Sequence, residues 1–107
     1  MALPPATSDV RAWINVPASL VPDPMLEGVI AAEMEIQATA CTVAADPEPL
    51  GPAHTQALYR RCARHIAARG VPLGMLGADT EYGPARLARW DAEVERLEGP
   101  SRKFVFG

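Results

Sequence analysis

The chain has 107 residues, a hydrophobic fraction of 49% and a net charge of −3 at neutral pH. This length allows one domain with a modest core, and the apolar fraction excludes a disordered acidic chain. The near-neutral charge argues against nucleic-acid binding as the main task. No apolar run approaches the length of a membrane span, and the N-terminal segment lacks the basic start of a signal peptide. We expect a soluble single domain, residues 1–107, that associates with other copies of itself.

Two helices are predicted in the first half of the chain from apolar residues at helical spacing. The first covers about residues 8–15 and presents Trp13 as a core anchor. The second covers about residues 24–45, is rich in alanine, and begins after Asp23, which is predicted to be its N-terminal cap.

The third predicted helix, about residues 52–69, carries arginines and no carboxylate. Arg60, Arg61 and Arg64 lie together on the flank of an apolar stripe. This flank has three possible roles: a solvated face, a subunit interface, or a surface that contacts phosphates.

Glu33 and Gln37 interrupt the apolar half of the second helix. A carboxylate in such a place needs a partner or a shifted pKa. In an antiparallel hairpin of the second and third helices, Glu33 lies level with Arg64 and His65. Gln37 lies level with Arg60. Glu33 then pairs with an arginine of its own hairpin, or Glu33 and Gln37 face the arginines of a neighbouring copy, or both are solvated. The second alternative predicts a subunit interface made by Glu33, Gln37, Arg60, Arg61 and Arg64.

The last third of the chain is predicted to hold a loop, a short helix and a tail. Residues 70–90 contain repeated glycines without helical periodicity, which indicates a structured loop. Asp91 is predicted to cap a helix over residues 91–98. The tail, residues 99–107, ends in an apolar tip that we expect to dock on a partner. The fold class is therefore mainly α: a small helical domain with a long antiparallel hairpin, a glycine-rich loop, a short C-terminal helix and a tail.

No catalytic or cofactor motif stands out. Cys41 and Cys62 are expected to be reduced core thiols, because the hairpin register separates them by ~9 Å along its axis, too far for a disulfide. Cys62 and His65 could supply two zinc ligands, but no further ligand lies at a zinc spacing. The glycines match no phosphate-binding loop. We expect no enzyme, no cofactor and no metal.

A series of short sequence segments in a characteristic order lies within residues 74–98, GMLGADTEYGPARLARWDAEVERLE. In this order the chain resembles the head-to-tail connector (adaptor, or head-completion) proteins of long-tailed bacteriophages. In that family an arginine-bearing helix, a glycine-rich loop, an acidic-aromatic-glycine turn, an R-x-x-R-[WF]-D segment and a short helix follow one another. The corresponding segments are Arg60-Arg61, residues 74–77, Glu81-Tyr82-Gly83, residues 86–91 and residues 94–97. Pro84 departs from the pattern, because it would weaken strand pairing after the turn.

The resemblance implies a structural virion protein, assembled in the host cytoplasm and located in the neck. It would form a ring of identical subunits, commonly dodecameric, that joins the portal to the next neck or tail protein and lets DNA pass. The portal or neck contact is expected at Arg86, Arg89, Phe104, Val105 and Phe106. The alternative is a small DNA-binding or regulatory module using the arginine helix, which would show strongly salt-dependent DNA affinity.

Overall fold

The computed structural model describes residues 2–44, 48–69 and 91–103. This part of the chain is mainly helical, which confirms the predicted class. Its elements are α1 (Thr7–Ile14), α2 (Asp23–Ala40), α3 (Pro52–Ala67), α4 (Ala92–Glu98) and the 3-10 turn η3 (Gly99–Ser101).

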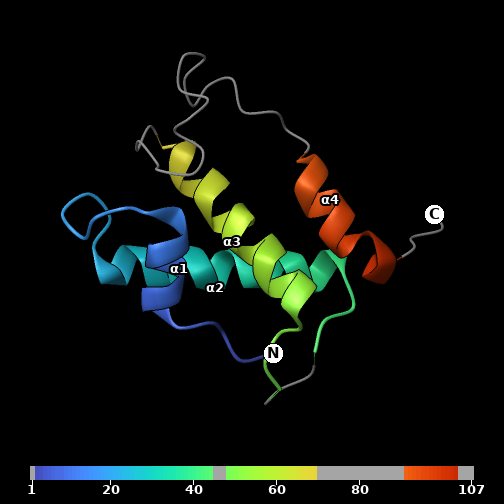
Figure 1. The fold of residues 1–107 in the computed structure, drawn as a ribbon. Helices are drawn as coiled ribbons and strands as arrows, with labels where there is room; N and C mark the ends of the chain where they lie inside the picture. The colour runs from blue at the N-terminus through green and yellow to red at the C-terminus, as the bar shows by residue number, and fades with distance from the viewer. Residues whose placement is uncertain (1, 45–47, 70–90, 104–107) are drawn as a thin grey trace.

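Helix α3 is the central element, because it packs against each of α1, α2 and α4 (Figure 1). It runs back across α2 at an oblique angle rather than alongside it. The predicted register holds at one end of the crossing, where Glu33 contacts His65. It is wrong for Gln37, which binds the carbonyl of His54 rather than lying beside Arg60. The oblique crossing explains why the register holds for Glu33 but not for Gln37. Two helices that cross at an angle move apart on either side of the crossing point, so residues that would be level in an antiparallel hairpin are no longer neighbours there.

Helix α2 ends at Ala40, so the predicted end at residue 45 is wrong. Cys41 has extended backbone (φ −131°, ψ 155°), and the chain after it pairs with the segment that follows η3. The Thr42 N–H donates to the Ser101 carbonyl (2.8 Å), and the Lys103 N–H donates to the Ala40 carbonyl (3.0 Å). These hydrogen bonds take the place of the helical hydrogen bonds that would form if the alanine-rich helix continued past Ala40.

The beginning of α2 also differs from the prediction. Pro22 is the residue that precedes the helix, and Asp23 lies inside its first turn without capping it. The Asp23 carboxylate instead accepts a hydrogen bond from Arg11 at 2.5 Å. This contact ties α1 to the start of α2. Helix α1 itself ends at Ile14, and the residue that caps it, Asn15, has a left-handed backbone (φ 60°) that asparagine tolerates better than most residues.

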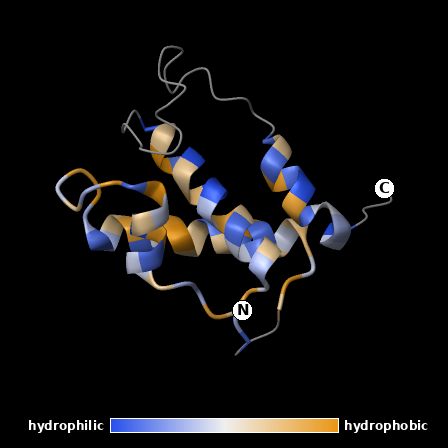
Figure 2. Ribbon diagram, in the orientation of Figure 1, coloured by the Kyte–Doolittle hydropathy of each residue, from blue (hydrophilic) through white to orange (hydrophobic). Residues whose placement is uncertain are grey.

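The core lies where α1, α2 and α3 meet, and Figure 2 shows hydrophobic residues concentrated around the crossing of α1 and α2. Trp13 sits at the edge of this core, partly buried, with its ring 5.7 Å from that of Tyr59. The prediction of a core anchor is thus met only in part. The buried core residues are Ala2, Val10, Ile14, Val16, Val21, Leu26, Val29, Ile30, Met34, Leu58, Cys62, Ala63, Ile66 and Ala67. None of the helices in the described ranges is long and apolar enough to cross a membrane.

Replacing Leu58 by alanine should lower the free energy of unfolding by about 2–5 kcal/mol, because it opens a cavity in the core. Leu58 is fully buried in α3. The matched control is Leu20→Ala, since Leu20 is 51% exposed and its truncation should change stability by no more than about 0.5 kcal/mol. Urea unfolding followed by circular dichroism measures both. Equal losses in the two variants would contradict this assignment of the core.

Candidate functional site

Arginines of α3 form ion pairs with carboxylates at the two ends of α4. Asp91 is the N-cap of α4, as predicted, and its side chain accepts hydrogen bonds from the backbone N–H groups of Glu93 and Val94. The same carboxylate lies 3.1 Å from Arg60 Nε and 3.7 Å from Arg64 Nη1. One side chain therefore starts α4 and fastens it to α3.

The pKa of Asp91 reflects this double role. Burial opposes ionisation, but the hydrogen bond and charge of Arg60, together with the two backbone N–H groups, outweigh it. The pKa is therefore lower than the ordinary aspartate value, and Asp91 is a carboxylate at neutral pH.

Glu98 closes the other end of α4 and is fully buried, with 0% of its surface exposed. Arg61 donates to both of its oxygens, from Nε at 2.6 Å and from Nη2 at 2.5 Å. Gln37 Nε2 donates at 2.9 Å and Cys41 Sγ at 3.4 Å. Burial alone would raise the pKa of Glu98, but the donors, led by Arg61, lower it below the ordinary value. A buried charge is thus held by two separate segments of the chain, α3 and the end of α2.

Two histidines make further contacts along α3. His65 Nδ1 lies 2.8 Å from a Glu33 oxygen, and its Nε2 lies 3.3 Å from Arg69 Nη2. Because a carboxylate only accepts, the hydrogen bond to Glu33 requires a proton on His65 Nδ1. At the opposite end of the helix, His54 Nε2 lies 2.6 Å from Ser101 Oγ.

These contacts change the interpretation of the predicted subunit interface. The structure brings its five members close together, but gives all of them partners in their own chain. Gln37 is 1% exposed and cannot reach a neighbouring copy from this position. Glu33 pairs within its own chain, although with His65 rather than with an arginine. Asp91 and Glu98 supply carboxylates to Arg60 and Arg61 within the chain, so these two arginines do not need anions from another copy.

The residues of the predicted portal contact all fall outside the described residues: Arg86, Arg89, Phe104, Val105 and Phe106.

Sequence reasoning missed Glu98 and Arg102 as members of this site. One signal could have found Glu98. Asp91 and Glu98 are seven residues apart, which places them on one face of a helix two turns long. Two acids on one face of a short helix are suitable partners for an arginine cluster whose own helix contains no acid.

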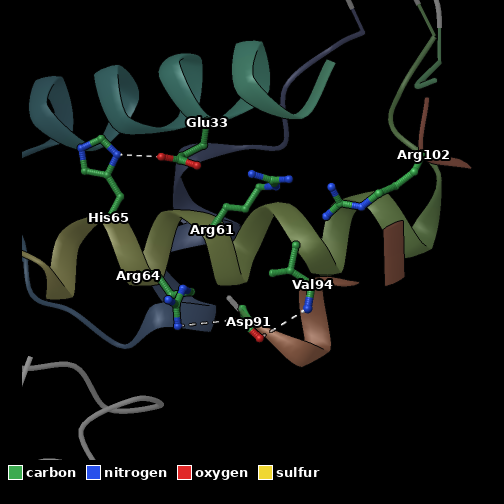
Figure 3. Close-up of a pocket in the computed structure, with 7 residues that line it drawn as sticks. All are labelled: Glu33, Arg61, Arg64, His65, Asp91, Val94 and Arg102. Carbon is green, nitrogen blue, oxygen red and sulfur yellow. Dashed lines mark hydrogen bonds and ion pairs between the residues drawn. The ribbon is translucent and has the colours of Figure 1, made fainter. Parts of the chain in front are cut away.

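A pocket of about 310 Å³ opens between α2, α3 and the C-terminal segment, residues 91–103 (Figure 3). Its walls are mostly charged. The lining residues are Glu33, Arg61, Arg64, His65, Asp91, Val94 and Arg102. Figure 3 shows the guanidinium groups of Arg61 and Arg102 pointing toward one another, while Arg64 points to Asp91. The pocket therefore offers several N–H donors over a short span.

The thiols are poorly suited to covalent chemistry. Burial, aided by the nearby Glu33 charge, raises the pKa of Cys62 to about 12. Burial and the Glu98 charge also raise the pKa of Cys41. Both groups are protonated at neutral pH, and the thiol is the unreactive form. Within residues 2–44, 48–69 and 91–103, no group of three or more His, Cys, Asp and Glu side chains is placed to hold a metal ion.

Comparisons of the chain with protein-family models, with curated proteins and with solved structures gave no match.

Replacing Glu98 by glutamine should lower the free energy of unfolding by about 3 kcal/mol, because it leaves the largely buried Arg61 charge without its counter-charge. The matched control is Glu95→Gln, on the same helix. Glu95 pairs with Arg102 at a more exposed place, so its loss should cost less than about 1 kcal/mol. Urea unfolding distinguishes the two. A Glu98 variant as stable as the control would show that the buried pair does not hold α4.

Stability should also fall in acid. Asp91 and Glu98 have folded-state pKa values lower than their ordinary values of 3.8 and 4.5. Their contribution is complete above those ordinary values and is lost as the pH falls through them toward the lower folded-state values. Urea midpoints measured between neutral pH and about pH 3 should therefore decline mainly below about pH 5. The decline should be shallower in Glu98→Gln. Parallel pH profiles for the two proteins would contradict the assignment.

Proposed function

We propose that the chain is a head-to-tail connector of a long-tailed bacteriophage, a structural virion protein rather than an enzyme. It would act in the neck, as a ring of identical subunits between the portal and the next neck or tail protein. The observation that carries the proposal is the attachment of α4 to the arginines of α3 through Asp91 and Glu98. In the connector pattern, the arginine helix and the R-x-x-R-[WF]-D segment with its short helix recur in one order. The ion pairs give a physical reason why both must be present.

The same contacts make the DNA-binding alternative less favourable. The three arginines that such a module would use are largely buried and lie beside carboxylates. Arg60 and Arg61 are hydrogen-bonded to Asp91 and Glu98, and Arg64 lies 3.7 Å from Asp91. A guanidinium already held by a carboxylate has fewer donors and less net charge to offer a phosphate. A balanced arginine face suits a channel, which must let DNA slide through without holding it.

The proposal assigns the portal or neck contact to two arginines of the loop and to the apolar tip. These are Arg86, Arg89, Phe104, Val105 and Phe106. An apolar tip next to basic residues can anchor on a partner by burying its aromatic rings.

The test is the molar mass of the purified protein, measured by light scattering at several concentrations, alone and mixed with its portal ring. We expect a closed oligomer, or a stoichiometric complex on the portal, and little affinity for duplex DNA. The control is a chain lacking residues 104–106, which should keep its helical circular dichroism and lose portal binding. A monomer or dimer that ignores the portal and binds duplex DNA with steep salt dependence would overturn the proposal in favour of the regulatory module.

A further inference from the structure

The pocket between α2, α3 and the C-terminal segment has donors that the chain itself leaves unused. Arg64 comes no closer than 3.7 Å to Asp91 and makes no hydrogen bond to the described residues. The Nε of Arg102 is buried and also lacks a hydrogen-bond partner among them. Buried N–H groups of a guanidinium are costly to leave unpaired. Arg64 lines the pocket with donors that make no hydrogen bond to the described residues, so the pocket is suited to an oxyanion that enters from outside. The Arg102 Nε is itself covered and would meet that oxyanion only after its side chain shifts.

The position of the donors favours a carboxylate on a side chain over a nucleic-acid phosphate. Arg64 is only 21% exposed, so a ligand must enter the pocket to reach it, whereas Arg102, 38% exposed, lies nearer the surface. The pocket wall also contains Glu33 and Asp91, which would repel a polyanion lying across its mouth. A single glutamate or aspartate side chain can enter the pocket and bring only one negative charge.

The chain carries such side chains on the outer face of α2. Glu27 and Glu35 are exposed, and neither makes an ion pair within the described ranges. Next to Glu35 lies Ile36, which is 51% exposed and is one of the large hydrophobic residues that the fold leaves outside. An unpaired acid beside an exposed apolar side chain is a combination that an interface can bury.

The acid and the pocket lie on different sides of α2. Glu33 lines the pocket, and Glu35 follows two residues later, about 200° around the helix. One copy can therefore offer its acid to a second copy while its own pocket receives the acid of a third.

We propose that Glu35 of one copy binds in the Arg64 and Arg102 pocket of the next, with Ile36 packing at the edge of the contact. Such a contact joins two different surfaces, so it repeats from copy to copy and closes into a ring when the rotation between copies allows. The inference rests on the proposed connector function for its ring, and it names the two surfaces that meet.

Charge reversal tests the contact. Glu35→Lys and Arg64→Glu should each weaken self-association on the order of a hundredfold, because each brings like charges together. Together they should restore it. In the double variant, and in an equal mixture of the two single variants, every interface pairs opposite charges or keeps the original pair. Sedimentation velocity from micromolar to millimolar concentration measures the assembly, and added salt should weaken it.

Two controls separate this contact from general effects. Glu48→Lys makes the same change in net charge at an exposed acid outside α2 and should leave association unchanged. Arg64→Gln removes the donors without adding a charge beside Asp91. It should weaken association less than Arg64→Glu, and it replaces that variant if circular dichroism shows a loss of helix.

The outcomes distinguish this contact from the connector function. If the wild type assembles and Glu35→Lys assembles equally well, the contact is wrong and the connector proposal stands. If the wild type stays monomeric at every concentration, the contact is also wrong, and portal binding decides the connector function separately. Salt-sensitive binding of duplex DNA that disappears in Arg64→Gln would assign the pocket to phosphates and overturn the inference.

Discussion

The buried carboxylate of Glu98 is the interaction on which the C-terminal half of the structure depends. It receives donors from α3, from the last turn of α2 and from the residue that ends α2. A buried ion pair is not strongly stabilising by itself, because desolvation offsets its attraction. Its loss is costly, and its geometry is selective. A placement of α4 must satisfy Arg61, Gln37 and Cys41 together, so the pair restricts where the helix lies more than it adds to the stability of the fold.

Helix α4 could not persist without such attachments. It has seven residues, fewer than an isolated helix needs to form in water. Its first turn is held by Asp91, which satisfies backbone donors and binds Arg60. Its last residue is Glu98. The chain then turns through η3 and pairs its backbone with the end of α2. The short helix is therefore anchored at both ends, and the segment that returns to α2 closes the structure.

The sequence predicts the helices well and their partners poorly. The four helices follow from apolar spacing, and the role of Asp91 follows from the preference for aspartate at a helix N-cap. The end of α2 could not be predicted in this way, because residues 41–45 remain compatible with a helix. What ends it is backbone pairing with Ser101 and Lys103, sixty residues away in the chain. Local preference carries no information about a contact at that distance, and tertiary contacts override it.

The same limit explains the error about the arginine helix. Its lack of acids indicates that its cations need partners, but not whether those partners lie in the same chain or in another copy. An intrachain partner is available without the loss of translational freedom that association entails, so it takes precedence wherever the fold can place one. Asp91 and Glu98 fill that role. The groups that remain available for assembly are N–H donors without a hydrogen bond inside the chain and the exposed acids on the outer face of α2. An interface in this protein is therefore best sought among charged groups whose hydrogen-bonding capacity is not filled inside the chain, not where charge is most concentrated in the sequence.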